Sequence, residues 1–128
     1  MEVKMKMAKI IGVSAAMIFG LSTTAVLAED FDTEDFPLVF LEINTTSADK
    51  YLQYHGKALT KISSGVYEEY RWGGASCGSR VLNDEQVAVL QRALDNPNVK
   101  VAFRYQPGQG EFTKCVVGFS LVRKGYTE

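Results

Sequence analysis

The two cysteines of this 128-residue chain, Cys77 and Cys115, enclose the segment that most restricts the possible folds. Within it, Asn83 and Gln86 have the spacing of a capping box, so we expect a helix to begin there. Apolar residues then recur at helical spacing until Asn96-Pro97, which cannot continue a helix. The segment therefore begins with a helix of about three turns.

The second half of the enclosed segment has the period of a β-strand. From Val99 to Gln106 apolar residues alternate with polar or small ones, which predicts a strand with one face in water. In Pro107-Gly108-Gln109-Gly110, proline fixes one φ angle and the two glycines can supply positive φ, so the chain should reverse there. We predict that Glu111 to Val122 returns as the second strand of an antiparallel hairpin, with a bulge at Gly118.

The first 28 residues have the pattern of a secretory signal peptide. A basic start is followed by the apolar run Ile10 to Leu21 and by the small-residue cleavage site Val26-Leu27-Ala28. Cleavage after Ala28 would leave residues 29–128 as a single mature domain, secreted or periplasmic. The alternative is that this segment is retained as a membrane anchor.

Export favours a disulfide between Cys77 and Cys115, because a cysteine pair in a small exported domain is usually oxidised. Neither cysteine has metal-ligand spacing, and we expect no metal or cofactor. With Glu2 and three lysines removed from the totals of 15 acidic and 14 basic residues, the mature chain has a net charge of about −3. That charge argues against a nucleic-acid partner.

The remaining mature sequence predicts three more strands. Glu29 to Asp35 is acidic and indicates a solvated, mobile N-terminus, or alternatively a cation site. The first strand is predicted at Phe36 to Ile43 and should be well buried. The second is predicted at Tyr51 to Ile62, with a bend near Gly56. The third is predicted at Val66 to Trp72 and ends at Gly73-Gly74. The order strand, strand, strand, helix, strand, strand favours a mainly β protein, a five-stranded OB-fold barrel with one helix. The alternative is an open α+β antiparallel sheet with one helix.

Catalysis is not expected. The single histidine, His55, is predicted to lie in a strand and has no serine or free thiol suited to act as its nucleophile. Glu68 and Glu69 are adjacent in a strand and should face opposite sides, so they cannot form the carboxylate pair of a glycosidase.

Tyr70-Arg71-Trp72 is the predicted binding site. Trp72 is the only tryptophan and is followed by two glycines that leave space above its ring, on which a sugar could stack. Arg71 and Tyr70 could add charged or hydroxyl contacts. The alternative is that Trp72 and Tyr70 pack inside the barrel while Arg71 points outward.

The stretch Val99 to Gly108, preceded by Gln91 to Leu94 and followed by Val117 to Ser120, resembles the receptor-binding B subunits of pentameric AB-type bacterial toxins, of the subtilase, typhoid and pertussis-like group. The resemblance implies an OB fold, a homopentamer with helices around a central pore, and recognition of a host cell-surface glycan. Where that group has a serine that contacts sialic acid, this chain has Asp35-Phe36-Pro37, so that site is not carried over.

The expected function is therefore that of a secreted, non-enzymatic toxin B subunit that binds a host glycan and carries a catalytic A subunit. The alternative from another functional class is a periplasmic immunity protein or enzyme inhibitor. An oligonucleotide-binding OB domain is disfavoured by export and by charge.

Overall fold

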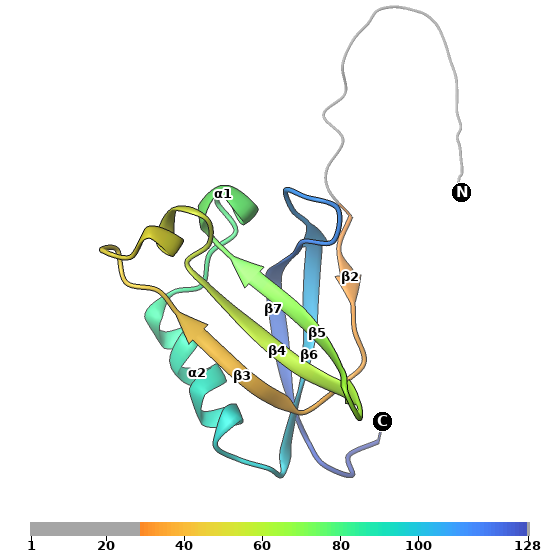
Figure 1. The fold of residues 1–128 in the computed structure, drawn as a ribbon. Helices are drawn as coiled ribbons and strands as arrows, with labels where there is room; N and C mark the ends of the chain where they lie inside the picture. The colour runs from red at the N-terminus through yellow and green to blue at the C-terminus, as the bar shows by residue number, and fades with distance from the viewer. Residues whose placement is uncertain (1–28, 128) are drawn as a thin grey trace, which may run out of the picture.

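The computed structural model describes residues 29–127; the predicted signal peptide and its cleavage site fall in residues 1–28, outside the described part. The fold is mainly β, a six-stranded mixed sheet with one long helix (Figure 1). Its elements are β2 (Phe31–Asp32), β3 (Leu38–Ile43), η1 (Asp49–Leu52), β4 (Gly56–Ser63), β5 (Val66–Trp72), α1 (Gly74–Cys77), α2 (Asp84–Leu94), β6 (Val99–Pro107) and β7 (Lys114–Arg123).

The strands are ordered β2-β6-β7-β5-β4-β3 across the sheet. Neighbours are antiparallel except β5 and β7, which are parallel and pair only at Arg71 and Cys115. Among the described residues no ladder joins β2 to β3, so the sheet is open and a closed five-stranded barrel is not established. The fold agrees with the α+β alternative, except that the sheet is mixed rather than wholly antiparallel.

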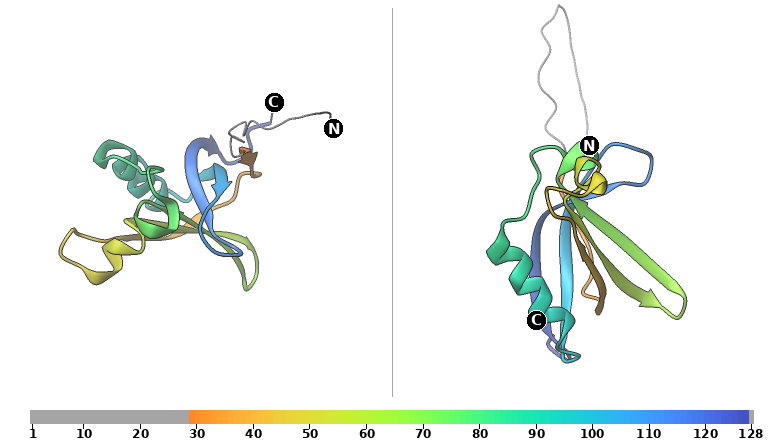
Figure 2. Two further views of the ribbon diagram at one scale, coloured as in Figure 1. Left: turned by 90° about the horizontal axis from the view of Figure 1, so that it is seen from above. Right: turned by 60° about the vertical axis from the view of Figure 1, so that its left-hand side comes forward.

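The helix and hairpin between the cysteines are confirmed. Asn83 Oδ1 accepts a hydrogen bond from the Gln86 amide at 2.8 Å, and Gln86 Oε1 accepts one from the Asn83 amide at 2.8 Å, completing the capping box. In the right-hand view of Figure 2, α2 lies on one side of the β6–β7 hairpin and the β4–β5 hairpin extends away on the other. Leu90 and Ala93 of α2 are buried in the core.

The details of the hairpin differ from the prediction at its turn. β7 begins at Lys114 rather than at Glu111, because residues 108–113 form a longer loop. Of the two glycines in this loop, only Gly110 has positive φ, at 98°. Gly108 is needed for another reason, since an added Cβ would lie 2.4 Å from Cys115 Sγ. The predicted bulge is present. Arg104 pairs with Gly118, but the next residue, Tyr105, pairs with Val116, so Val117 is left out of the ladder.

The predicted second strand was wrong over its first residues. Instead of a strand from Tyr51, the chain forms the 3-10 helix η1 and a turn, and β4 begins only at Gly56. Tyr51 and Gln53 donate their amides to the carbonyls of Ala48 and Lys50, so this segment closes its hydrogen bonds locally. His55 accordingly lies in a loop and not in a strand.

The N-terminal expectations also need correction. The acidic segment includes strand β2, in which Phe31 pairs with Tyr105 and the Asp32 carboxylate contacts Arg104 Nε at 2.9 Å. The next strand begins at Leu38 and is not well buried. Because β3 is the last strand in the sheet order, it leaves three large apolar side chains partly in water, Val39, Phe40 and Ile43.

The predicted disulfide between Cys77 and Cys115 is present and joins α1 to the start of β7. Both cysteines are buried beside a core whose largest members are Trp72, Tyr70 and Phe103. Among the residues that the structure describes, no helix is long and apolar enough to cross a membrane.

Candidate functional site

The three residues predicted to bind glycan divide between the two faces of β5. Tyr70 and Trp72 point into the core and are each 2% exposed, whereas Arg71 points to the outer face. The Tyr70 ring stacks on Phe103 with centroids 4.4 Å apart, and the Trp72 ring covers Gly56. In this structure neither aromatic ring offers a face to a ligand, which agrees with the packing alternative for these two residues.

Burial has an electrostatic consequence at Tyr70. Burial away from water has the largest effect, and the nearby charge of Glu68 has the next largest. Together they raise the pKa of the Tyr70 phenol to about 12. The hydroxyl is therefore neutral at physiological pH, as expected of a core tyrosine.

Arg71 is held rigidly on the outer face by three groups. Its Nε donates to Glu69 Oε2 at 2.6 Å, and its Nη1 donates to Ser76 Oγ at 3.3 Å. The guanidinium also lies over the Tyr54 ring, 4.5 Å from the centroid, in a cation–π contact. A guanidinium fixed in this way is arranged before a ligand arrives, so binding would cost little side-chain entropy.

Lys57 gives this face a second positive charge. It is directly opposite Arg71 in the β4–β5 ladder, and its Nζ is 3.3 Å from Glu69 Oε1. Partial burial alone would raise the pKa of Glu69, but the hydrogen bond and charge of Arg71, with those of Lys57, hold that pKa below its usual value. Glu69 is therefore ionised and keeps the two cations together.

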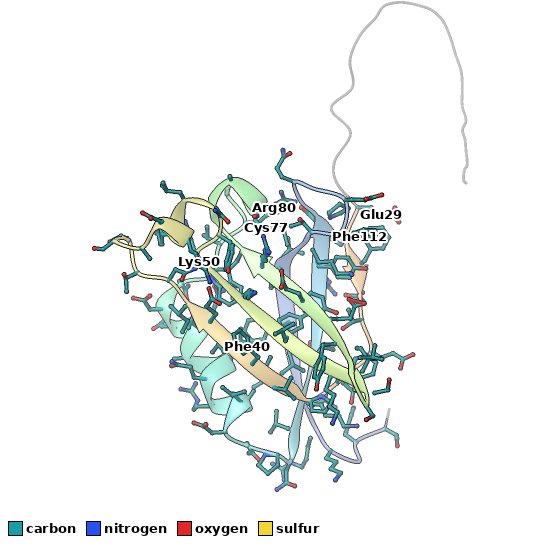
Figure 3. The ribbon with its side chains drawn as sticks, viewed as in Figure 1. Glu29, Phe40, Lys50, Cys77, Arg80 and Phe112 are labelled. Carbon is teal, nitrogen blue, oxygen red and sulfur yellow. A yellow bond between two sulfur atoms is a disulfide. The ribbon has the colours of Figure 1, made fainter. Side chains whose placement is uncertain are left out.

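Tyr54 forms the base beneath the two cations. It is 4% exposed, and its hydroxyl donates to Glu42 Oε2 at 3.0 Å. Phe40, which Figure 3 labels on β3, borders Lys57 and is 40% exposed. We call this set the Arg71 face; its members are Phe40, Tyr54, Lys57, Glu69, Arg71 and Ser76.

Ser76 connects the Arg71 face to the neighbouring loops. Its amide donates to the Gln53 carbonyl and its own carbonyl accepts from the Gln109 amide, each at 2.9 Å. Figure 1 shows α1 between the loop that carries η1 and the loop that joins β6 to β7. These two loops, residues 44–55 and 108–113, are therefore fixed relative to Arg71.

Glycines make this close packing of loops possible. An added Cβ at Gly74 would lie 2.6 Å from the Gln53 backbone, and one at Gly108 would lie 2.6 Å from the Ser76 carbonyl oxygen. Of the members of the Arg71 face, sequence reasoning predicted only Arg71 as a binding residue and missed the other five: Phe40, Tyr54, Lys57, Glu69 and Ser76. The signal that could have suggested the loop contacts was the set of glycines at 73, 74 and 108.

The other titratable residues considered in the sequence lie apart from each other. The His55 ring stacks on Tyr51, with centroids 4.0 Å apart. Glu68 binds Lys114 at 3.1 Å, whereas Glu69 binds Arg71 and Lys57. Within residues 29–127, no group of three metal-ligating side chains is gathered.

The Arg71 face thus combines charged donors, an acceptor and a partly exposed aromatic ring on a rigid sheet surface. Such a surface can hold a polar ligand by hydrogen bonds. Comparison of the chain with protein-family models, with curated proteins and with solved structures finds no match.

Proposed function

We propose that this chain is the receptor-binding B subunit of a secreted AB-type toxin, and that it binds a host cell-surface glycan through the Arg71 face. It would assemble as a homopentamer and carry a separate catalytic A subunit. In this proposal the chain itself performs no reaction and needs no cofactor.

The proposal includes an OB-type barrel, which the strand order supports. β2 and β3, at opposite ends of that order, are parts of one stretch, and Phe36 between them bridges Val101 of β6. We interpret residues 31–43 as a single interrupted first strand that contacts both the second and the fourth strands. The parallel contact of β5 with β7 and the helix between β5 and β6 fit the same topology.

The observation that carries the function is the position of the Arg71 face. OB folds bind oligosaccharides on their second and third strands, between the loop that joins strands one and two and the loop that joins strands four and five. Here Lys57 and Arg71 lie on β4 and β5, and Ser76 hydrogen-bonds both corresponding loops, 44–55 and 108–113. The exposed part of the Phe40 ring would provide the stacking surface that the sequence predicts at Trp72.

Binding at such an open face should be weak for one copy. Five copies in a ring would raise the avidity by about 10²- to 10⁴-fold where glycan spacing permits. Two features support assembly. Val39 and Ile43 are exposed apolar residues on edge strand β3, and the outward face of α2, with exposed Gln91, Arg92 and Asp95, suits a water-filled pore.

The test is a glycan array probed with labelled parent protein, with Arg71→Ala, and with Arg123→Ala as a control of equal charge change. Arg123 is exposed at the far end of β7, so the control should bind as the parent does. Arg71→Ala should lose glycan labelling. It should keep the oligomeric state of the parent in native mass spectrometry, and it should keep the parent's melting temperature. Unchanged labelling by a folded Arg71→Ala protein would remove the Arg71 face from the proposal.

An inhibitor or immunity protein is the second candidate function, and two exposed side chains favour it. Leu52 and Phe112 are 76% and 83% exposed, and they project from the two loops that Ser76 fixes in place. Rigid loops with apolar tips suit insertion into the cleft of a partner enzyme. A monomer in native mass spectrometry, together with no glycan labelling, would favour this candidate over the toxin subunit.

A further inference from the structure

Gly118 is the one glycine within residues 29–127 whose position requires neither positive φ nor close packing. The others have positive φ or, as at Gly56 and Gly108, would bring a Cβ within 3 Å of another group. At Gly118 an added Cβ would meet only Arg104 Cβ, at an ordinary 3.7 Å. A glycine inside a strand destabilises it relative to alanine, and such glycines occur at bulges, as here, and where a ligand approaches the backbone closely.

A hollow lies over Gly118 on the outer surface of β2, β6 and β7. Its volume is about 360 Å³, near the lower end of the roughly 300–1,000 Å³ typical of small-molecule sites. Cross-strand neighbours with small side chains leave this space, since Ala102 pairs with Ser120 beside the Arg104–Gly118 pair. The hollow is on different strands from the Arg71 face.

The polar groups of the hollow favour a neutral ligand. Its charged lining consists of Asp32 and Arg104, which are 2.9 Å apart and compensate each other. Because the pair has no net charge, it gives no net attraction to a free anion or to a free cation. The exposed Ser120 hydroxyl adds a group that can both donate and accept.

A peptide strand is a poor fit to the same place. Strand addition needs an unpaired edge, whereas this hollow opens over the face of the sheet above β6, which is paired on both sides, by β2 and β7. A ligand must therefore lie on the sheet surface and satisfy a carboxylate, a guanidinium and a hydroxyl at once. Adjacent hydroxyl groups on a sugar ring can donate to Asp32 and accept from Arg104.

We propose that the hollow over Gly118 binds one neutral sugar unit, as a saccharide subsite separate from the Arg71 face. Gly118 and Ala102 form its floor, Asp32 and Arg104 bind adjacent hydroxyls, and Ser120 contacts the opposite side of the ring. The site does not depend on Arg71, so either site can fail without the other.

The proposal is tested by NMR titration of the ¹⁵N-labelled mature protein with lactose, methyl α-mannoside and N-acetylglucosamine. At least one of these sugars should shift the amides of Ala102, Arg104 and Gly118. Gly118→Val, which fills the hollow where the backbone has room for a side chain, should abolish these shifts and leave the melting temperature unchanged or higher. Ala102→Val fills the same space from β6. It replaces Gly118→Val as the test variant if Gly118→Val does not fold.

The control is Arg71→Ala, which should retain these shifts because it alters only the other face. Absence of shifts at the three amides with all three sugars would overturn the proposal. So would a folded Gly118→Val protein that still gives the parent's shifts. If Gly118→Val instead lowers the oligomer mass and no sugar shifts these amides, the hollow is a contact between subunits, and the sugar subsite is refuted.

Discussion

Replacement of both cysteines by alanine should remove a large share of the stability of this domain. The Cys77–Cys115 bridge encloses all of α2 and β6, and its two ends are buried. In the unfolded chain the bridge restricts every residue between them. Most of its effect is therefore expected in the unfolded state.

The magnitude follows from the length of the enclosed loop. For a sequence separation of 38, the loop-entropy relation gives about 4 kcal/mol. Domains of this size have a total unfolding free energy of only about 5–15 kcal/mol. Since about 1 kcal/mol corresponds to roughly 4–8 °C for a domain of about 100 residues, the melting temperature should fall by roughly 15–30 °C.

The assay is equilibrium urea unfolding of the oxidised parent, the reduced parent and the Cys77→Ala/Cys115→Ala variant, followed by Trp72 fluorescence. The reduced parent is the matched control, because it loses the covalent bond but keeps both sulfur atoms. Both unbridged proteins should also show a larger m-value, since their unfolded chains expose more surface. A loss below about 1 kcal/mol in both would refute the argument that the bridge acts by restricting the unfolded chain.

Two further predictions concern the buried aromatic residues of β5. Trp72→Ala should lower the free energy of unfolding by about 3–5 kcal/mol because the ring is 2% exposed, whereas Trp72→Phe should lower it less. The measurement is thermal unfolding followed by circular dichroism. Equal stability of Trp72→Ala and the parent would contradict the assignment of Trp72 to the core. Because the pKa of Tyr70 is raised to about 12, its neutral phenol contributes stability that is complete below about pH 10, the ordinary tyrosine value, and is lost as the pH rises through about 12. Urea unfolding across that interval should show a smaller decline for Tyr70→Phe, and an identical decline in both proteins would show that Tyr70 is not responsible.

The region between the cysteines could be predicted because its signals are local. The hydrogen bonds of the capping box join residues three apart, and the alternation from Val99 depends only on neighbouring positions. The hairpin then follows, because Pro107 and Gly110 reverse the chain between two strands of compatible pattern. None of these elements needs a distant partner to be recognised.

The first half of the mature chain could not be predicted as well because distant contacts determine it. β2 exists because β6 lies beside it, and Phe31 pairs with a residue more than 70 positions away, Tyr105. The segment from Tyr51 to Tyr54 has apolar residues typical of a strand. Its conformation is instead fixed by the contact of Gln53 with Ser76 and by the burial of Tyr54 beneath Arg71.

The candidate site shows a subtler limit of sequence reasoning. Alternation in β5 correctly predicts that Arg71 and Trp72 face opposite sides, but it does not tell which side is inside. The partners across the ladder decide this, since Gly56 pairs with Trp72 and Ala58 with Tyr70. Small residues on β4 thus make room for the two large rings.

That pairing depends on one residue near the β4–β5 turn. Ser63 pairs with Val66 and Lys61 pairs with Tyr67, so the ladder skips Ile62. Without this bulge a regular hairpin would place Lys57 opposite Trp72 and Ala58 opposite Arg71. A shift of one position exchanges the faces of a strand, so the same sequence would then bring a charged side chain against the core. Ile62 therefore sets the register that buries Trp72 and pairs Lys57 with Arg71, and it is this register that assembles the Arg71 face.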